Sequence, residues 1–146
     1  MNDDRLNIGP RFDRISLSEF DYAGFCRSIA PAAIDAFGAY RAAMITDHEV
    51  WSADWEIIRH QAIEHNRSIA GRHGVIRIWP VSYFDDALCR RAWGLSAEEV
   101  LRRAAPACEE AYPLADGAFL LVTSELVRGD ALDDLSESVM SRLRKQ

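Results

Sequence analysis

Three ionisable side chains follow one another at four-residue steps in a segment with helical periodicity: Glu56, His60 and Glu64. Residues four apart are neighbours on a helix surface, so an imidazole between two carboxylates could ligate a metal or have its pKa raised. A metal site usually needs further ligands from another element, and neither a Glu-x-x-His nor a His-Glu-x-x-His spacing occurs in the chain. The favoured interpretation is a solvated helix face with no metal ion and no cofactor.

A second histidine, His65, falls on the apolar stripe of the same segment. That stripe consists of Trp51, Trp55, Ile58, Ala62, His65 and Ile69. We expect the stripe to be buried in the main core, where a lone histidine more often donates a hydrogen bond to a carbonyl than acts as a catalytic base. Catalysis by His65 would need a nucleophile within hydrogen-bonding reach, and the sequence alone brings no serine or cysteine there.

Trp79 and Tyr83 are the residues best suited to anchor a protein partner. They belong to the β-branched and aromatic run of residues 75–84, which Pro80 interrupts. Proline removes a hydrogen-bond donor from a strand, so we expect this run to be an edge strand on which Trp79 and Tyr83 are exposed. Tryptophan and tyrosine are enriched among the residues that dominate the energy of protein–protein binding.

Two local patterns superficially match nucleic-acid-binding motifs. Residues 71–74 have the Gly-x-x-Gly spacing of a KH loop, but a β-branched run follows them where that fold has a helix. Residues 86–105 match a helix-turn-helix, yet Glu98 and Glu99 would face phosphates at the start of the reading helix. A helix-ending glycine pair and an αα-hairpin used for packing are the preferred interpretations, and nucleic-acid binding is disfavoured.

Helices dominate the elements that must position these residues. A capping box at Ser18 and apolar residues at steps of three and four predict helical structure as far as Met44, with a kink or a break near Ala30 because Pro31 lacks an amide hydrogen. Further capping signals open helices at Asp47, at Asp85 or Asp86, at Ser96 and at Asp130.

Two segments have strand character: residues 75–84 and the continuous apolar run of residues 118–123. Because helices separate them, we expect a β-α-α-β crossover that makes the two strands parallel neighbours. The predicted class is a helix-rich α+β fold with five or six helices and two short strands, and an all-α bundle is the alternative because two strands alone are marginal. Residues 1–14 are predicted to be a flexible arm and residues 15–146 a single globular domain.

Composition limits the classes of partner and compartment. The 146 residues include 17 Lys and Arg against 23 Asp and Glu, a net charge of −6 that disfavours phosphate backbones and anionic lipid. The sequence has neither the apolar run of a membrane span nor that of a secretory signal. Its three cysteines are odd in number and widely spaced, which indicates reduced thiols and favours the cytoplasm.

Together these features favour a small acidic cytoplasmic protein that acts by protein–protein interaction, of the inhibitor, immunity or regulatory type. An aromatic patch would anchor the partner and an acidic rim would attract it. The alternative is a small enzyme or ligand-binding domain, whose tryptophan-lined pocket uses His60 or His65 with a carboxylate such as Glu56 or Glu64. A small-molecule ligand and a homo-oligomer remain open alternatives.

The length and the cysteine spacing predict that the protein folds with neither a metal nor a disulfide. A chain of this length buries roughly 70% of its unfolded surface, enough for an unassisted core. Circular dichroism spectra should therefore be unchanged by a chelator and by a reductant, and a loss of helical signal with either reagent would contradict the prediction.

Overall fold

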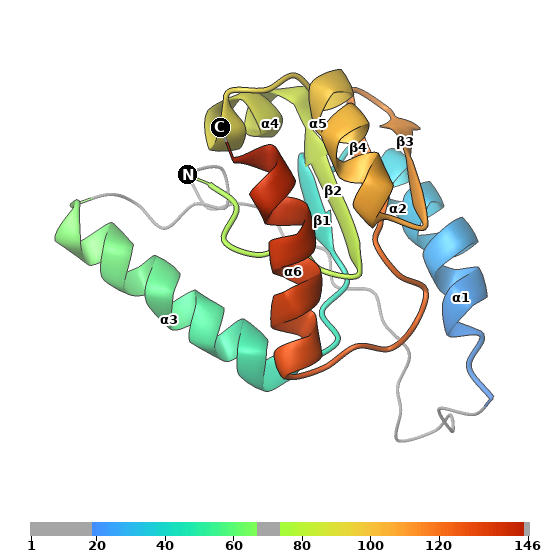
Figure 1. Cartoon of the computed structure of the whole chain (residues 1–146), viewed down its shortest axis with the longest axis horizontal. Coiled ribbons are helices and arrows are strands. Elements are labelled where there is room, and N and C mark those ends of the chain that lie inside the picture. The colour runs from blue at the N-terminus through green and yellow to red at the C-terminus, as the bar shows by residue number, and fades with distance from the viewer. Residues whose placement is uncertain (1–18, 67–73, 145–146) are drawn as a thin grey trace.

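A four-stranded sheet organises the chain, for which the computed structural model describes residues 19–66 and 74–144 (Figure 1). Along the chain the elements are α1 (Tyr22–Gly24), the π-helical turn η1 (Phe25–Ile29), α2 (Ala30–Phe37), β1 (Arg41–Ala43), α3 (His48–Glu64), β2 (Val81–Asp85), α4 (Asp86–Trp93), α5 (Ala97–Ala104), the 3₁₀ turn η3 (Ala105–Ala107), β3 (Glu110–Leu114), β4 (Gly117–Leu121) and α6 (Asp130–Leu143). The predicted arm of residues 1–14, Ser18, Ile69 and residues 71–73 lie outside the described ranges.

The sheet has the order β1-β2-β4-β3, and all of its neighbouring strands are antiparallel. The predicted α+β class is confirmed, and the all-α alternative is wrong. The two predicted strands, now β2 and β4, are neighbours as expected, but they pair antiparallel, with Tyr83 opposite Phe119. β2 is a central strand because β1 pairs with its other side, so the prediction of an edge strand is wrong.

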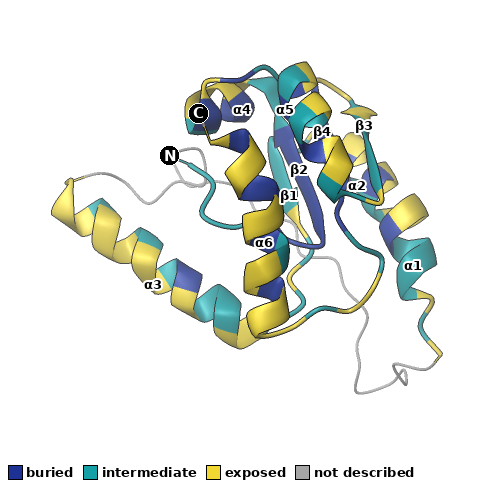
Figure 2. Cartoon of the chain, in the orientation of Figure 1, coloured by how far each residue is buried: buried dark blue, intermediate teal, exposed yellow. Residues whose placement is uncertain are grey.

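Helices cover both faces of this sheet, and the strands alternate accordingly. Phe84, Ala118 and Leu120 face the core that α4, α5 and α6 complete. Tyr83 and Phe119 point the opposite way, into a smaller core shared with the first helical segment, which consists of α1, η1 and α2. The two central strands are buried almost throughout (Figure 2). Alternate residues of each strand thus face two different cores. Because both faces of the sheet are covered, β2 and β4 are almost continuously apolar in sequence.

The first helical segment changes geometry where proline enters it. Pro31 occupies the first turn of α2, where its missing amide hydrogen costs little, and the wider η1 turn precedes it. α2 then ends at Gly38, which has the left-handed φ of 62°. The predicted helix does not reach Met44, because residues 41–43 form β1 and pair with β2.

The sequence analysis predicts β4 but misses β3, and therefore misses the hairpin that the two strands form. Only Ala115 and Asp116 connect its strands, and Ala115 has the unusual φ of 48°. Gly117 follows at a position where an added Cβ would lie 2.3 Å from the carbonyl oxygen of Phe84. The Asp116-Gly117 pair between two apolar runs is a hairpin signal that could have identified this turn. Pro113 is tolerated in β3 because that strand lies at the edge of the sheet.

Helix α3 projects away from the sheet and its covering helices (Figure 1). It begins at Asp47 as predicted, where Oδ1 accepts the backbone N–H groups of Glu49 and Val50 at 3.0 and 3.2 Å. However, neither core cluster of the described residues contains a side chain of α3. The predicted burial of its apolar stripe is wrong: Trp51, Trp55, Ile58 and Ala62 are only half-buried, and His65 is exposed.

The difference in burial between the sheet and α3 predicts unequal losses of stability for two truncations. Leu120→Ala empties a site with 0% exposure and should lower the free energy of unfolding by about 2–5 kcal/mol. Ile58→Ala removes a half-buried side chain outside both cores and should cost less than about 1.5 kcal/mol. Urea denaturation of both variants measures this contrast, and equal losses would contradict it.

Candidate functional site

The predicted catalytic candidates all lie on or just beyond α3, on the surface of the molecule. Glu56, His60 and Glu64 are exposed at successive turns, and His65 follows the helix end. The Glu56 carboxylate accepts hydrogen bonds from Nη2 and Nε of Arg59, at 2.7 and 3.1 Å. Within the described ranges, no cluster of three or more histidine, cysteine or acidic residues is arranged to hold a metal ion.

Both residues predicted to anchor a partner are buried. Trp79 is 3% exposed and Tyr83 is 0% exposed, so the prediction that they stand out on an edge strand is wrong. Tyr83 donates from its hydroxyl to Oδ1 of Asp116 at 3.1 Å, and the Trp79 amide donates to Oγ of Ser82 at 2.9 Å. These contacts belong to the sheet and its turns, which leaves neither ring available to a partner.

An open hollow of about 490 Å³ lies between the ends of α4 and α6. Arg90, Arg91, Trp93 and Arg144 are among its lining residues, and neither His60 nor His65 contributes to it. Two of its arginines already pair with carboxylates, Arg90 with Asp86 and Arg144 with Glu137. This hollow therefore differs from the predicted pocket that combines tryptophan with histidine.

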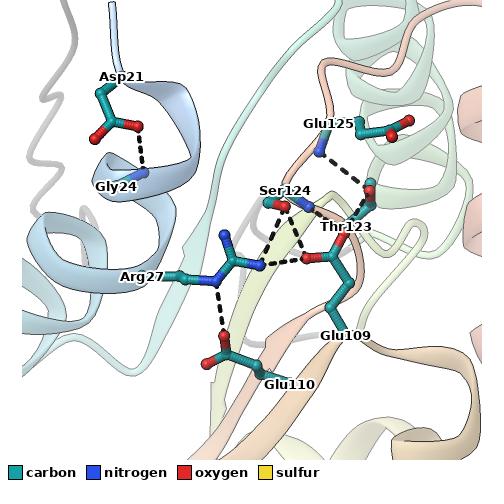
Figure 3. Close-up of polar contacts among 8 residues, drawn as sticks. All are labelled: Asp21, Gly24, Arg27, Glu109, Glu110, Thr123, Ser124 and Glu125. Carbon is teal, nitrogen blue, oxygen red and sulfur yellow. Dashed lines mark hydrogen bonds and ion pairs between the residues drawn. The ribbon is translucent and has the colours of Figure 1, made fainter.

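A dense polar cluster joins the first helical segment to the sheet (Figure 3). Arg27 of η1 donates through Nη2 to Glu109 at 2.7 Å and through Nε to Glu110 at 2.8 Å. The Glu109 carboxylate also accepts the backbone N–H of Ser124 at 2.8 Å, its hydroxyl at 2.7 Å and the hydroxyl of Thr123 at 3.1 Å. With four donors on one carboxylate, the cluster is a clamp between layers. The sequence analysis did not find this cluster, because Arg27 and Ser124 lie 82 and 15 residues from Glu109 in the chain.

The cysteines behave as buried apolar residues. All three are free thiols, with Cys26 and Cys89 buried and Cys108 half-buried. Burial raises the pKa of the Cys89 thiol to about 12 and that of Cys108 to about 11. Both thiols are therefore protonated near neutral pH, which is the unreactive state of a cysteine.

The apolar surface of α3 is the remaining candidate for function. Ile57 and Ile63 are 46% and 69% exposed, and on another side of the same helix the half-buried rings of Trp51 and Trp55 stack with centroids 6.3 Å apart. Large exposed apolar side chains of this kind mark interaction surfaces when they gather on one element. The sequence analysis named the tryptophans but assigned them to the core.

Comparison with known proteins adds no relative: no known family, no curated protein and no solved structure matches the chain. Among the described residues, no helix has the length and apolar character needed to cross a membrane.

The clamp predicts a pH dependence of stability. The hydrogen bonds from Ser124 hold the pKa of the Glu109 carboxyl below its ordinary value. A lowered folded-state pKa means that the ionised carboxylate stabilises the fold above the unfolded-state pKa, and that this stabilisation is lost as the pH falls through the folded-state pKa. Glu109→Gln should therefore lower the melting temperature at pH 7, and the difference from wild type should shrink below about pH 4.3.

Glu137→Gln serves as the matched control for this experiment. It removes an exposed ion pair with Arg144, in which both side chains are more than half exposed. Exposed pairs contribute little to stability, so its melting temperature should follow wild type across the pH range. A Glu109→Gln difference that stays constant from pH 7 to pH 3 would contradict the role of the ionised carboxylate.

Proposed function

We propose that this chain is a small protein-binding protein that uses α3 to dock on a basic partner protein. The observation that carries the proposal is that a helix of 17 residues holds large apolar side chains yet contributes none of them to either described core. Burying apolar surface is the main favourable term in protein association, so a partner that covers α3 would gain what the fold itself leaves unused.

Charge on α3 specifies the chemistry of this partner. Three exposed carboxylates, Glu49, Glu56 and Glu64, stand on the helix against a single arginine, Arg59. The whole chain carries a net charge of −6, so a basic surface would be attracted over long range as well as at contact. One recurring mode of recognition places the apolar side chains of a helix into a groove of the partner. The proposed partner is therefore a protein with an apolar groove and a basic rim.

The inhibitor, immunity and regulatory roles all fit such a binding protein, because each acts by occupying a surface of its partner. The proposal includes the cytoplasm as the compartment, supported by three free thiols in one chain. It replaces Trp79 and Tyr83 with Ile57, Ile63 and the Trp51–Trp55 stack as the anchors.

The test is a paired substitution on α3. Ile57→Ser with Ile63→Ser removes two exposed side chains that neither core uses, so the fold should be retained. The partner is a basic protein that the immobilised chain retains from a cell lysate. Removing the apolar anchors should weaken its binding by at least about tenfold, which corresponds to 1.4 kcal/mol. The binding constant is measured by calorimetry with the purified partner, and raising the salt concentration should weaken the wild-type complex further.

A matched control comes from two apolar residues exposed elsewhere. Ile29 and Leu126 are 53% and 43% exposed, close to the exposure of the α3 pair, and lie on η1 and on the segment after β4. Ile29→Ser with Leu126→Ser should leave the binding constant at the wild-type value. If the control pair weakens binding as much as the α3 pair, or if the α3 pair has no effect, the proposed function is wrong.

A further inference from the structure

Asp54 is a buried carboxylate on a helix whose other described side chains are exposed or half-buried. Its side chain is 10% exposed and accepts two hydrogen bonds from one guanidinium, from Nε of Arg77 to Oδ2 at 2.6 Å and from Nη2 to Oδ1 at 3.0 Å. Two parallel N–H···O bonds fix both the position and the orientation of a carboxylate. The middle of α3 is thus attached to Arg77 in a defined geometry.

Arg77 is shared between two helices. While Nε and Nη2 bind Asp54 of α3, Nη1 donates to Oδ1 of Asp133 on α6. The guanidinium carbon also lies 6.0 Å from the centre of the Trp79 ring, and the arginine side chain is only 15% exposed. Arg77 is therefore a bridge from the projecting helix to the helix that covers the sheet.

Two hydrogen bonds attach the beginning of α3 to the segment before α6. Oδ2 of Asp47 accepts the backbone N–H of Gly129 at 3.0 Å, and the hydroxyl of Thr46 donates to the carbonyl of Val127 at 2.6 Å. From Glu56 onward every described residue of the helix is exposed or half-buried. The Arg77 bridge lies two turns further along the helix, and two separated points of attachment define the direction of the helix axis.

We propose that Arg77 is the positioning residue of the α3 surface, a latch that holds the helix ordered and aimed away from the sheet. Most helical stability in proteins comes from tertiary packing, and α3 contributes to neither core cluster, so its order depends on such an attachment. The consequence for binding rests on the proposed function of α3. A helix held in its docking orientation loses less conformational entropy when a partner binds, so release of the latch weakens the complex.

Hydrogen exchange followed by mass spectrometry tests the latch without any partner. Asp54→Asn and Arg77→Gln should each speed the exchange of α3 amides by about tenfold or more, while amides of β4 and α5 keep their wild-type rates. The double variant Asp54→Asn with Arg77→Gln should show less than the sum of the two logarithmic effects, because either single change already breaks the bridge.

Glu56→Gln is the control on the same helix. It removes the exposed ion pair with Arg59, which lies one turn further along the same helix. The substitution should leave the exchange of α3 unchanged. Wild-type exchange of α3 in both latch variants would overturn the proposal. Faster exchange of β4 and α5 together with α3 would also overturn it, since the pair would then support the whole fold rather than one helix.

The binding arm uses the partner from the α3 experiment. Asp54→Asn and Arg77→Gln should weaken the complex by about tenfold, whereas Glu137→Gln, which removes an exposed pair on α6, should change affinity by about twofold or less. If the latch variants loosen α3 but leave affinity unchanged, the positioning role in binding is wrong while the latch itself stands. If serine substitutions at Ile57 and Ile63 leave affinity unchanged, the proposed function fails, and the exchange result still decides the latch.

Discussion

The pairing of β2 with β4 is the constraint on which the rest of the structure depends. All five residues of β4 and four of the five in β2 are buried, so this antiparallel pair must be covered on both faces and both edges. The edges are filled by β1 and β3, and the faces by α4, α5 and α6 on one side and the first helical segment on the other. Gly117 admits the close approach of the Phe84 carbonyl that the pair requires. Once the sheet is covered, no face of it remains for α3.

Features of the fold that are encoded locally could be predicted from the sequence. The caps at Asp47 and Ser96 are confirmed, because a side chain that binds amides two or three residues away leaves a readable signal. The predicted runs at residues 75–84 and 118–123 contain most of β2 and β4, because burial on both faces gives continuous apolar sequence. The two edge strands escaped prediction because their identity lies in long-range pairing. Residues 41–43 sit between apolar positions with helical spacing, and Pro113 obscures β3.

The candidate site was predicted less well, for a related reason. Pro80 predicts an edge strand, but it precedes β2, where no strand hydrogen bond needs its missing donor. Its carbonyl accepts a hydrogen bond from the amide of Val122 at 2.8 Å. Trp79 and Tyr83 are consequently buried. The apolar stripe with Trp51 and Trp55 predicts that one face of α3 is buried. Periodicity does not indicate whether this chain or another one buries that face. Only the arrangement of the sheet and its helices decides that question.

The rigidity of the sheet reaches α3 through a short segment of backbone. Ile78 follows Arg77 directly, is 0% exposed and donates its amide to Oγ of Ser136 on α6 at 3.0 Å. Trp79 comes next and is also buried, immediately before the chain enters β2. The backbone of Arg77 is therefore fixed by the large core, and its guanidinium, which has a planar fork of donors, transfers that fixed direction to Asp54. A lysine would offer a single flexible charge at this position and could hold the helix near α6 without setting its angle. The orientation of α3 is thus determined by the buried backbone next to Arg77.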